Sequence, residues 1–287
     1  MNKNKGIQYI ILSAFCFALM NTFVKLSGDI SSIQKSFFRN LVALIFALIV
    51  LKKSNEGIKF KKGNLSYLII RSVFGTIGIL CNFYAIDHLM LSDASMLGKL
   101  SPFFTIIFSL LFLKEKMSLF QFVSIIIAFI GSLFIIKPSF SNPALIPSMI
   151  GVLGAMGAGA AYTTVRFLGQ RGERGPMIVF FFSTFSCLSV VPYLIFNFEP
   201  MTLQQIVYLL LAGLAAAGGQ FSITAAYSYA PAKDISVYDY SQVIFAAILG
   251  LFLFQQIPDY LSIVGYLIIF AISLIMFIKT KSTSSVK

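Results

Sequence analysis

The stretch SPFFTIIFSLLFL at residues 101–113 is long, apolar and free of charged side chains. A comparable stretch, SQVIFAAILGLFL, follows 140 residues later at 241–253. Each stretch begins two residues after an ionisable residue, which is Lys99 in the first case and Asp239 in the second. Because similarity at a fixed distance is typical of an internal duplication, the two stretches predict a chain built from two related halves.

The composition of the whole chain indicates that these stretches lie in a membrane. Of the 287 residues, 58% are apolar and only 11% are charged, and the mean hydropathy is +0.89. Soluble domains carry about 25% charged residues, and a soluble fold with so few would lack the polar side chains to cover its surface. The composition therefore predicts an all-α integral membrane protein. It excludes an ordinary cytosolic enzyme, a disordered chain and a disulfide-rich secreted protein.

The apolar segments predict ten transmembrane helices, since about 20 apolar residues are needed to cross the hydrocarbon core. The predicted spans are 7–27, 33–51, 66–86, 92–113, 119–137, 146–168, 177–197, 204–226, 235–254 and 259–279. A second match between the halves pairs 13–26 with 154–167 at an offset of 141. Five spans in each half is an odd number, so the second half must lie inverted in the bilayer. We predict a five-helix repeat at 1–137, a second, inverted five-helix repeat at 146–279, and a cytoplasmic tail at 280–287.

The basic residues predict the orientation of the chain. The net charge is +12, from 22 Lys and Arg against 10 Asp and Glu. If the N-terminus is cytoplasmic, 16 of the bases fall on or near that side, whereas the opposite side keeps only Lys25, Lys35 and Lys137. Because cytoplasmic loops carry the excess of Lys and Arg, we expect both termini in the cytoplasm and the protein in the cell (cytoplasmic) membrane. The bases form no stripe on one face, so no nucleic-acid partner is expected.

Four segments carry a resemblance to a known family. They are RSVFGT at 71–76, DASMLGKLSPFFTIIFSLLFLKEK at 93–116, GGQFSITAAYSYAPAKDISVYDYSQVIFAAILGLFLF at 218–254 and PDYLSIVGYLIIFAISLIMF at 258–277. On these segments the chain resembles the EamA-type transporters of the drug/metabolite transporter superfamily over nearly its whole length. The resemblance implies a duplicated ten-helix fold and a role in transport. The chain departs from the family pattern of a Glu after the apolar run in both halves. Glu115 follows the run of the first half, whereas the second half has Gln255 and Gln256 there.

Four charged residues within the predicted spans are candidates for a function, because insertion of a charge there costs roughly 2.5–3.5 kcal/mol. Lys25 and Arg166 lie near span ends and are interpreted as anchors. Arg39, Arg71 and Lys99 supply three cations, and Asp239 supplies one acid. Lys99 and Asp239 occupy equivalent positions of the two halves, so we expect them on opposing helices near the membrane centre. Two interpretations stay open: the two side chains bind a substrate, or they form a structural ion pair that locks one conformation.

Polar side chains near these charges are candidates for lining a substrate cavity, because polar stripes on apolar helices face a cavity and not lipid. Ser95, Lys99 and Pro102 follow one another at helical spacing, which predicts a common face. Arg71 lies near the cytoplasmic end of its span and Arg39 near the outer end, so each can bind a ligand or extend its charge to the membrane surface. The full set of candidate substrate-binding residues is Lys99, Asp239, Tyr238, Ser241, Gln242, Ser95, Asn82, Tyr84, Gln220, Asn21, Tyr162, Arg39 and Arg71.

The sequence contains no pattern that predicts a metal site, a cofactor or a catalytic centre. Cys16, Cys81 and Cys187 lie far apart in apolar runs, and neither HExxH nor GxxxxGK[ST] occurs. The only histidine, His88, is predicted in a loop. We therefore predict no cofactor, no metal and no enzymatic activity.

We expect a secondary transporter that moves a small polar metabolite by alternating access. Three intramembrane cations against one acid favour an anionic or zwitterionic solute, such as an amino acid, an amino-acid derivative or a molecule like S-adenosylmethionine. The expected partners are this solute, the lipid bilayer and a coupled proton or exchange solute, and the protein is expected to be a monomer or homodimer. A lipid flippase or channel is the alternative. An intramembrane enzyme is less favoured, because it needs paired acids or a Ser–His arrangement within the spans.

Overall fold

Helices occupy most of the residues that the computed structural model describes, which are 3–54, 57–113, 118–139, 142–229 and 236–285. In chain order the elements are α1 (Lys3–Leu26), α2 (Ser32–Lys53), α3 (Leu65–His88), α4 (Leu91–Gly98), α5 (Ser101–Leu113), α6 (Leu119–Ile136), α7 (Leu145–Gln170), α8 (Gly175–Asn197), α9 (Leu203–Tyr229), the 3₁₀-helix η1 (Ser236–Tyr240), α11 (Ser241–Phe254) and α12 (Tyr260–Ser285). This order confirms the predicted all-helical fold class.

The lengths and compositions of the helices suit a membrane. Eight helical segments in the described part of the chain are long and apolar enough to span a bilayer, with α4 and α5 counted together as Leu91–Phe112. Two shorter apolar segments follow them, Tyr238–Phe254 from η1 and α11 and Tyr260–Met276 from α12. Helix α12 runs on through most of the predicted tail at 280–287. Glu115, and the predicted start of the ninth span at residue 235, lie outside the described residues.

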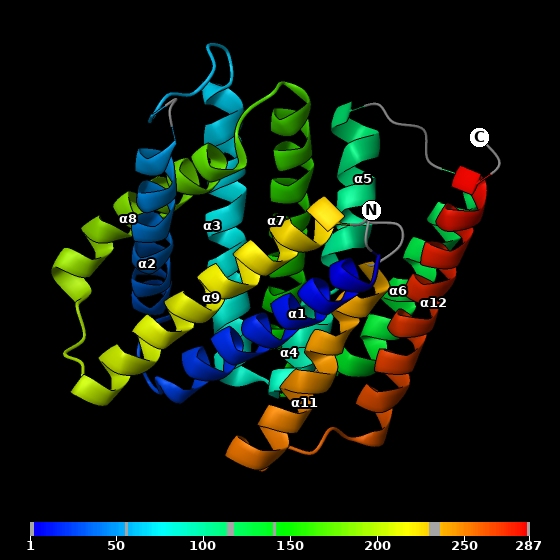
Figure 1. Ribbon diagram of the computed structural model, residues 1–287. Helices are drawn as coiled ribbons and strands as arrows, with labels where there is room; N and C mark the ends of the chain where they lie inside the picture. Colours follow the sequence, from blue (N-terminus) through cyan, green and yellow to red (C-terminus); the bar gives the residue numbers. More distant parts are fainter. Residues whose placement is uncertain (1–2, 55–56, 114–117, 140–141, 230–235, 286–287) are drawn as a thin grey trace.

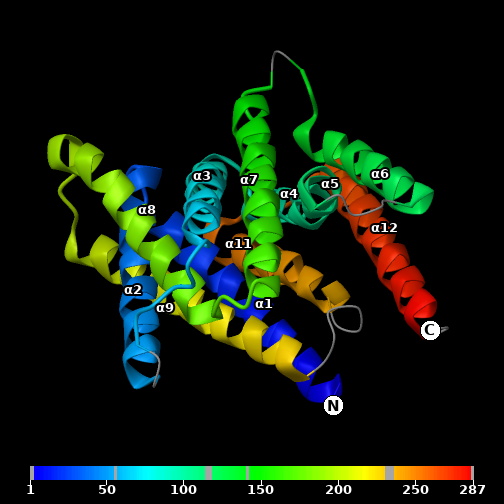
Figure 2. The ribbon, with the colours of Figure 1, turned by 90° about the horizontal axis from the view of Figure 1, so that it is seen from above.

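The helices pair across the two halves of the chain, as Figure 1 and Figure 2 show. α1 packs along α9, and α3 packs along α7. The pair α2–α8 lies at one edge of the molecule and the pair α6–α12 at the opposite edge. α5 contacts α7, α11 contacts α1, and α4 contacts α11. Helices of one half therefore pack mainly against helices of the other half.

The fourth predicted span is interrupted. α4 ends at Gly98, Lys99 is its C-cap residue, and α5 begins at Ser101. Pro102 lies in the first turn of α5 and has no N–H, so it cannot continue the hydrogen bonds of α4. Ser95 therefore lies in α4, Lys99 at its C-cap and Pro102 in α5, and the common face of the three residues stays a prediction.

The helix of the ninth predicted span also departs from α-helical geometry. Asp239 lies in η1, a short 3₁₀-helix, and the α-helix begins only at Ser241. The tighter 3₁₀ turn changes the direction in which side chains leave the backbone, so α-helical spacing does not hold across this point. We call the turn between α4 and α5 and the 3₁₀-helix η1 the two helix interruptions, and both lie directly before the apolar stretches that resemble each other.

Glycines let α3 and α7 approach each other closely. A Cβ atom added to Gly157 would lie 3.0 Å from the carbonyl oxygen of Phe74 and 3.1 Å from the Cα of Gly78. A Cβ atom added to Gly154 would lie 3.1 Å from the backbone nitrogen of Asn82. Small residues allow two backbones to pack directly in a membrane, where no hydrophobic force draws helices together. The glycines of these two helices therefore hold the halves together by close packing.

Replacement of Gly157 by alanine tests this packing. The new methyl group meets backbone atoms that cannot rotate away, so we expect the variant to unfold at a lower temperature than the wild type in detergent. Gly169→Ala, on the same helix, is the matched control, because no atom lies within 4 Å of the added group. This control should match or exceed the wild type, since alanine favours a helix by about 1 kcal/mol over glycine. Equal melting of both variants would contradict the close contact.

Candidate functional site

An ion pair joins the two helix interruptions. Lys99 Nζ lies 2.5 Å from Asp239 Oδ2. The side chain of Lys99 is 10% exposed and that of Asp239 is 27% exposed, so the pair is largely withdrawn from solvent. The other carboxylate oxygen, Oδ1 of Asp239, is buried without a hydrogen-bond partner among the described residues. The two side chains that were expected to meet do so directly, and one carboxylate oxygen stays free for another group.

Tyr240, the last residue of η1, connects this pair to α12. Its hydroxyl donates to the main-chain carbonyl of Lys99 at 3.5 Å and shares a 2.5 Å hydrogen bond with Ser273 Oγ. A carbonyl at a helix interruption needs such a partner, because lipid offers none. The sequence reasoning missed Tyr240, although its place directly after Asp239 was a usable signal.

Tyr162 on α7 lies near the charged groups of both halves. The residue is 56% exposed. Its phenol lies close enough to Asp239, Arg71 and Arg39 to interact with the charges of all three. These charged residues come from η1, α3 and α2, so Tyr162 is surrounded by ionisable groups from elements of both halves. We call Arg39, Arg71, Lys99, Tyr162 and Asp239 the central site.

Arg39 and Arg71, two members of the central site, lie near the starts of two different helices. Arg39 lies about 10 Å along α2 from its first residue, and Arg71 about 9 Å along α3, at 1.5 Å per residue. The two helices run in opposite directions, as Figure 1 shows. Long side chains then bring the two guanidinium groups within range of one another's charge. Their positions near opposite span ends, taken from the sequence, gave no sign of this meeting.

Each arginine is held by one contact and keeps free donors. Arg39 Nη1 donates to Asn40 Oδ1 at 2.7 Å, and Asn40 Nδ2 donates to Ser186 Oγ at 2.8 Å. The guanidinium of Arg71 lies over the ring of Phe182, 3.8 Å from its centre. Nε of Arg39, and Nε and Nη1 of Arg71, are buried and have no hydrogen-bond partner in the described part of the chain. The two guanidinium groups therefore keep donor atoms that no described side chain satisfies.

Several other predicted residues lie near the helix interruptions. Asn21 on α1 donates from Nδ2 to Ser95 Oγ on α4 at 3.5 Å, and its Oδ1 is buried without a described partner. The hydroxyl of Ser241, at the start of α11, is also buried and without a described partner. Asn82 Oδ1 lies 3.9 Å from the Cβ position of Gly98, beside the end of α4.

The remaining candidates have other surroundings. Tyr84 stacks on His88 of the same helix, with ring centres 4.1 Å apart. Gln220 is exposed on α9, Tyr238 is 39% exposed, and Gln242 is half-buried in the first turn of α11. Their part in substrate binding stays a prediction.

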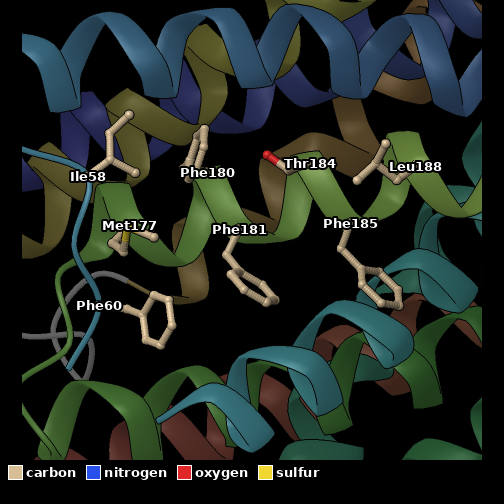
Figure 3. Close-up of a pocket in the computed structure, with 8 residues that line it drawn as sticks. All are labelled: Ile58, Phe60, Met177, Phe180, Phe181, Thr184, Phe185 and Leu188. Atoms are coloured by element: carbon tan, nitrogen blue, oxygen red, sulfur yellow. The ribbon is translucent and has the colours of Figure 1, made fainter. Parts of the chain in front are cut away.

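A separate pocket of about 350 Å³ lies along α8. Figure 3 shows that most of its lining side chains come from α8, while Ile58 and Phe60 come from the segment before α3. Thr184 supplies the polar atom, and the other lining side chains are apolar. A pocket with this lining offers almost nothing to a polar solute, so it is distinct from the central site.

Comparison with known proteins identifies the family. The EamA-like transporter family matches residues 4–137 and again 149–278. The chain belongs to this family. The resemblance predicted from the four motifs is therefore confirmed, and the protein is a membrane transporter and not an enzyme.

Relatives of this EamA-like transporter cover almost its whole length. It is 31% identical to the pseudopaline exporter CntI of Pseudomonas aeruginosa (strain UCBPP-PA14) over 266 residues, which is 92% of this chain and 93% of the exporter. It is 28% identical to solute carrier family 35 member G1 of Mus musculus, over 91% of this chain and 75% of the mouse protein. A solved crystal structure shares the fold, with a TM-score of 0.62 at 11% identity, over 96% of this chain and 99% of that one.

Polar contacts join several helix ends of this EamA-like transporter, on the side where α1 and α3 end. Lys35 Nζ lies 2.6 Å from Asp87 Oδ1, and the Lys35 side chain is fully buried. Lys25 Nζ donates to the carbonyl of Ile86 at 2.8 Å and also to that of Leu89. The sequence reasoning treated both lysines only as topology markers and missed Asp87. In the fold, the contacts of Lys25 and Lys35 connect α1 and α2 to the end of α3.

Two further carboxylates link helices of the two halves. Asp93, buried on α4, accepts a 2.5 Å hydrogen bond from Tyr266 on α12, and the sequence reasoning did not include it among the intramembrane acids. Asp259, just before α12, accepts from Lys137 at the end of α6. Its partial burial raises the pKa of Asp259, but hydrogen bonds from Lys137 and the Ser262 backbone outweigh this effect and hold that pKa below its ordinary value.

Asp87→Asn tests how much the buried pair contributes to stability. The change leaves the fully buried ammonium of Lys35 without its carboxylate, so we expect a loss of about 3 kcal/mol. Thermal unfolding of the purified protein in detergent measures the effect. The control is Asp259→Asn, which breaks a pair whose carboxylate side chain is 51% exposed and should cost no more than about 1 kcal/mol. Unchanged unfolding of Asp87→Asn would contradict a stabilising role for this pair.

Proposed function

We propose that this protein is a secondary transporter that moves a small polar metabolite across the cytoplasmic membrane by alternating access. The observation that carries the proposal is the Lys99–Asp239 pair, which joins the turn between α4 and α5 to the 3₁₀-helix before α11 and lies near the exposed Tyr162. Ionisable residues inside a membrane mark substrate or ion pathways, and interrupted helices frequently form transporter sites. The proposed solute is an amino acid, an amino-acid derivative or a zwitterion like S-adenosylmethionine.

The proposal includes the topology. The chain has ten spans, with inverted repeats at 1–137 and 146–279, and both termini and the tail at 280–287 are cytoplasmic. The helix contacts support this arrangement, because exchanging each element with the one five spans away turns α1–α9 into α7–α3 and α5–α7 into α11–α1. The same exchange leaves α2–α8 and α6–α12 unchanged. A two-fold relation between the halves requires these pairings.

The Lys99–Asp239 pair couples solute binding to the conformational change of the transporter. An ammonium group of the solute binds Asp239 Oδ1, the oxygen that has no described partner, while a carboxylate competes for Lys99. Because Lys99 and Asp239 belong to different halves, a solute that binds one arrangement of the pair more tightly shifts the balance between conformations. Asn21, Ser95, Asn82 and Ser241 lie beside the pair and contact the rest of the solute.

Direction and energy source complete the proposal. The similarity to a pseudopaline exporter favours export over import. The driving force is a gradient of protons or of an exchange solute, and the transporter works as a monomer or homodimer in the lipid bilayer.

Lys99→Ala and Asp239→Asn test the proposed site. A thermal-shift screen of amino acids, nucleosides and their conjugates first identifies a solute, since a ligand of the folded state raises its melting temperature. We expect uptake of that solute into proteoliposomes to fall about tenfold or more in both variants, because each loses a charge-assisted contact. Lys137→Gln is the control and should keep wild-type uptake, because Lys137 pairs with Asp259 and not with the central site.

The charge-swapped variant Lys99→Asp/Asp239→Lys separates a binding role from a structural one. We expect it to recover the melting temperature that the single variants lose, but not the uptake. Recovery of both would assign the pair to structure alone, and wild-type uptake by the two single variants would overturn the site. Electrical conductance at channel rates would favour the channel alternative.

A further inference from the structure

We infer that Arg39 and Arg71 form a carboxylate subsite, so that the transported solute carries a net negative charge. The inference rests on the proposed function and narrows its solute class. The solute has one acidic group for the two arginines in addition to the groups that meet Lys99 and Asp239. An amino-acid derivative with a further carboxylate fits this description, whereas a zwitterion without net charge does not.

The first argument is the balance of charge around the central site. Lys99 is neutralised by Asp239. Asp87 pairs with Lys35, and Asp93 accepts a hydrogen bond from the neutral hydroxyl of Tyr266. Among the described residues, no carboxylate forms an ion pair with Arg39 or Arg71. Neither guanidinium therefore has a counter-ion of its own in the described part of the chain, and an acidic group of the solute supplies one.

The second argument is geometric. Arg71 lies over Phe182, and Arg39 donates to Asn40, whose amide donates to Ser186. Phe182 and Ser186 are one turn apart on the same helix, α8, so the two guanidinium groups lie at neighbouring positions along it. Tyr162, on α7, lies within range of both charges. A guanidinium presents its N–H groups in a planar fork that matches the two oxygens of a carboxylate. This set of donors is suited to an acidic group held between two helices of one half and one helix of the other.

The third argument is that contacts with the protein occupy only some of the donor atoms of each guanidinium group. Asn40 accepts from one nitrogen of Arg39, and Phe182 covers one face of Arg71. Three N–H-bearing nitrogens, Nε of Arg39 and Nε and Nη1 of Arg71, stay buried without a described partner. Buried charged donors without partners are costly, and two like charges in a low dielectric repel each other. A bound carboxylate relieves both penalties, which a role in packing alone does not.

The test uses matched pairs of probes that differ in one acidic group. Purified full-length protein is tested by thermal shift, and proteoliposomes by uptake, with glutamate and glutamine, aspartate and asparagine, and succinate and its monoamide succinamate. We expect at least one acid to bind and to be taken up, and its amide to bind at least about tenfold more weakly. Arg39→Gln and Arg71→Gln should remove this discrimination, whereas Arg71→Lys should keep part of it because the charge remains.

Two controls keep the outcomes distinct. Lys52→Gln removes an exposed cation from the same helix as Arg39 and should leave discrimination unchanged. The melting temperature without probes shows whether each arginine variant is folded. Equal binding of acids and amides, or wild-type discrimination in a folded Arg39→Gln or Arg71→Gln variant, overturns the subsite alone. If the protein takes up no small polar solute at all, the proposed function itself fails.

Discussion

An interrupted helix inside a membrane must satisfy its backbone groups within the protein, because lipid offers no hydrogen bonds. The chain meets this constraint at Lys99, where the backbone N–H returns to the carbonyls of Met96 and Leu97 and the carbonyl accepts from Tyr240. The side chain of Lys99 then reaches Asp239 at the second interruption. The two irregular segments support each other, and the long helices around them can stay regular.

The positions of the helix ends also determine where polar groups lie in the fold. Helix ends expose polar groups only at the interruptions and at the membrane surfaces. The surface ends of α1, α2 and α3 are joined by Lys25, Lys35 and Asp87, whose polar groups already have protein partners. At the interruptions, Lys99 of the first half meets Asp239 of the second, and Asp239 Oδ1 has no described partner there. This unsatisfied acceptor beside an ammonium group is the reason that the proposed function places the solute at the pair.

The sequence predicted the fold class and the meeting of Lys99 with Asp239, because a constant offset relates equivalent positions of a duplicated chain. It did not predict that the helices end there, since helical spacing was assumed to continue through Lys99 and across Asp239. The convergence of Arg39 and Arg71 was also missed, because their distances from the span ends say nothing about side-chain direction. Asp87 and Asp93 were overlooked because a position near a helix end does not reveal burial against another helix.

The charged groups of the fold divide into two kinds. Lys35, Lys25 and Lys137 have partners within the protein, and their contacts join one helix end to another. Arg39 and Arg71 keep buried donors that the described residues do not satisfy. An arginine with a purely structural role would be stabilised by an ion pair with a nearby carboxylate. A duplicated chain rich in helix contacts offers many positions for such a carboxylate. The fold therefore contrasts helix-end charges that have protein partners with two arginines whose remaining donors have none among the described residues, as expected where local rules yield to function.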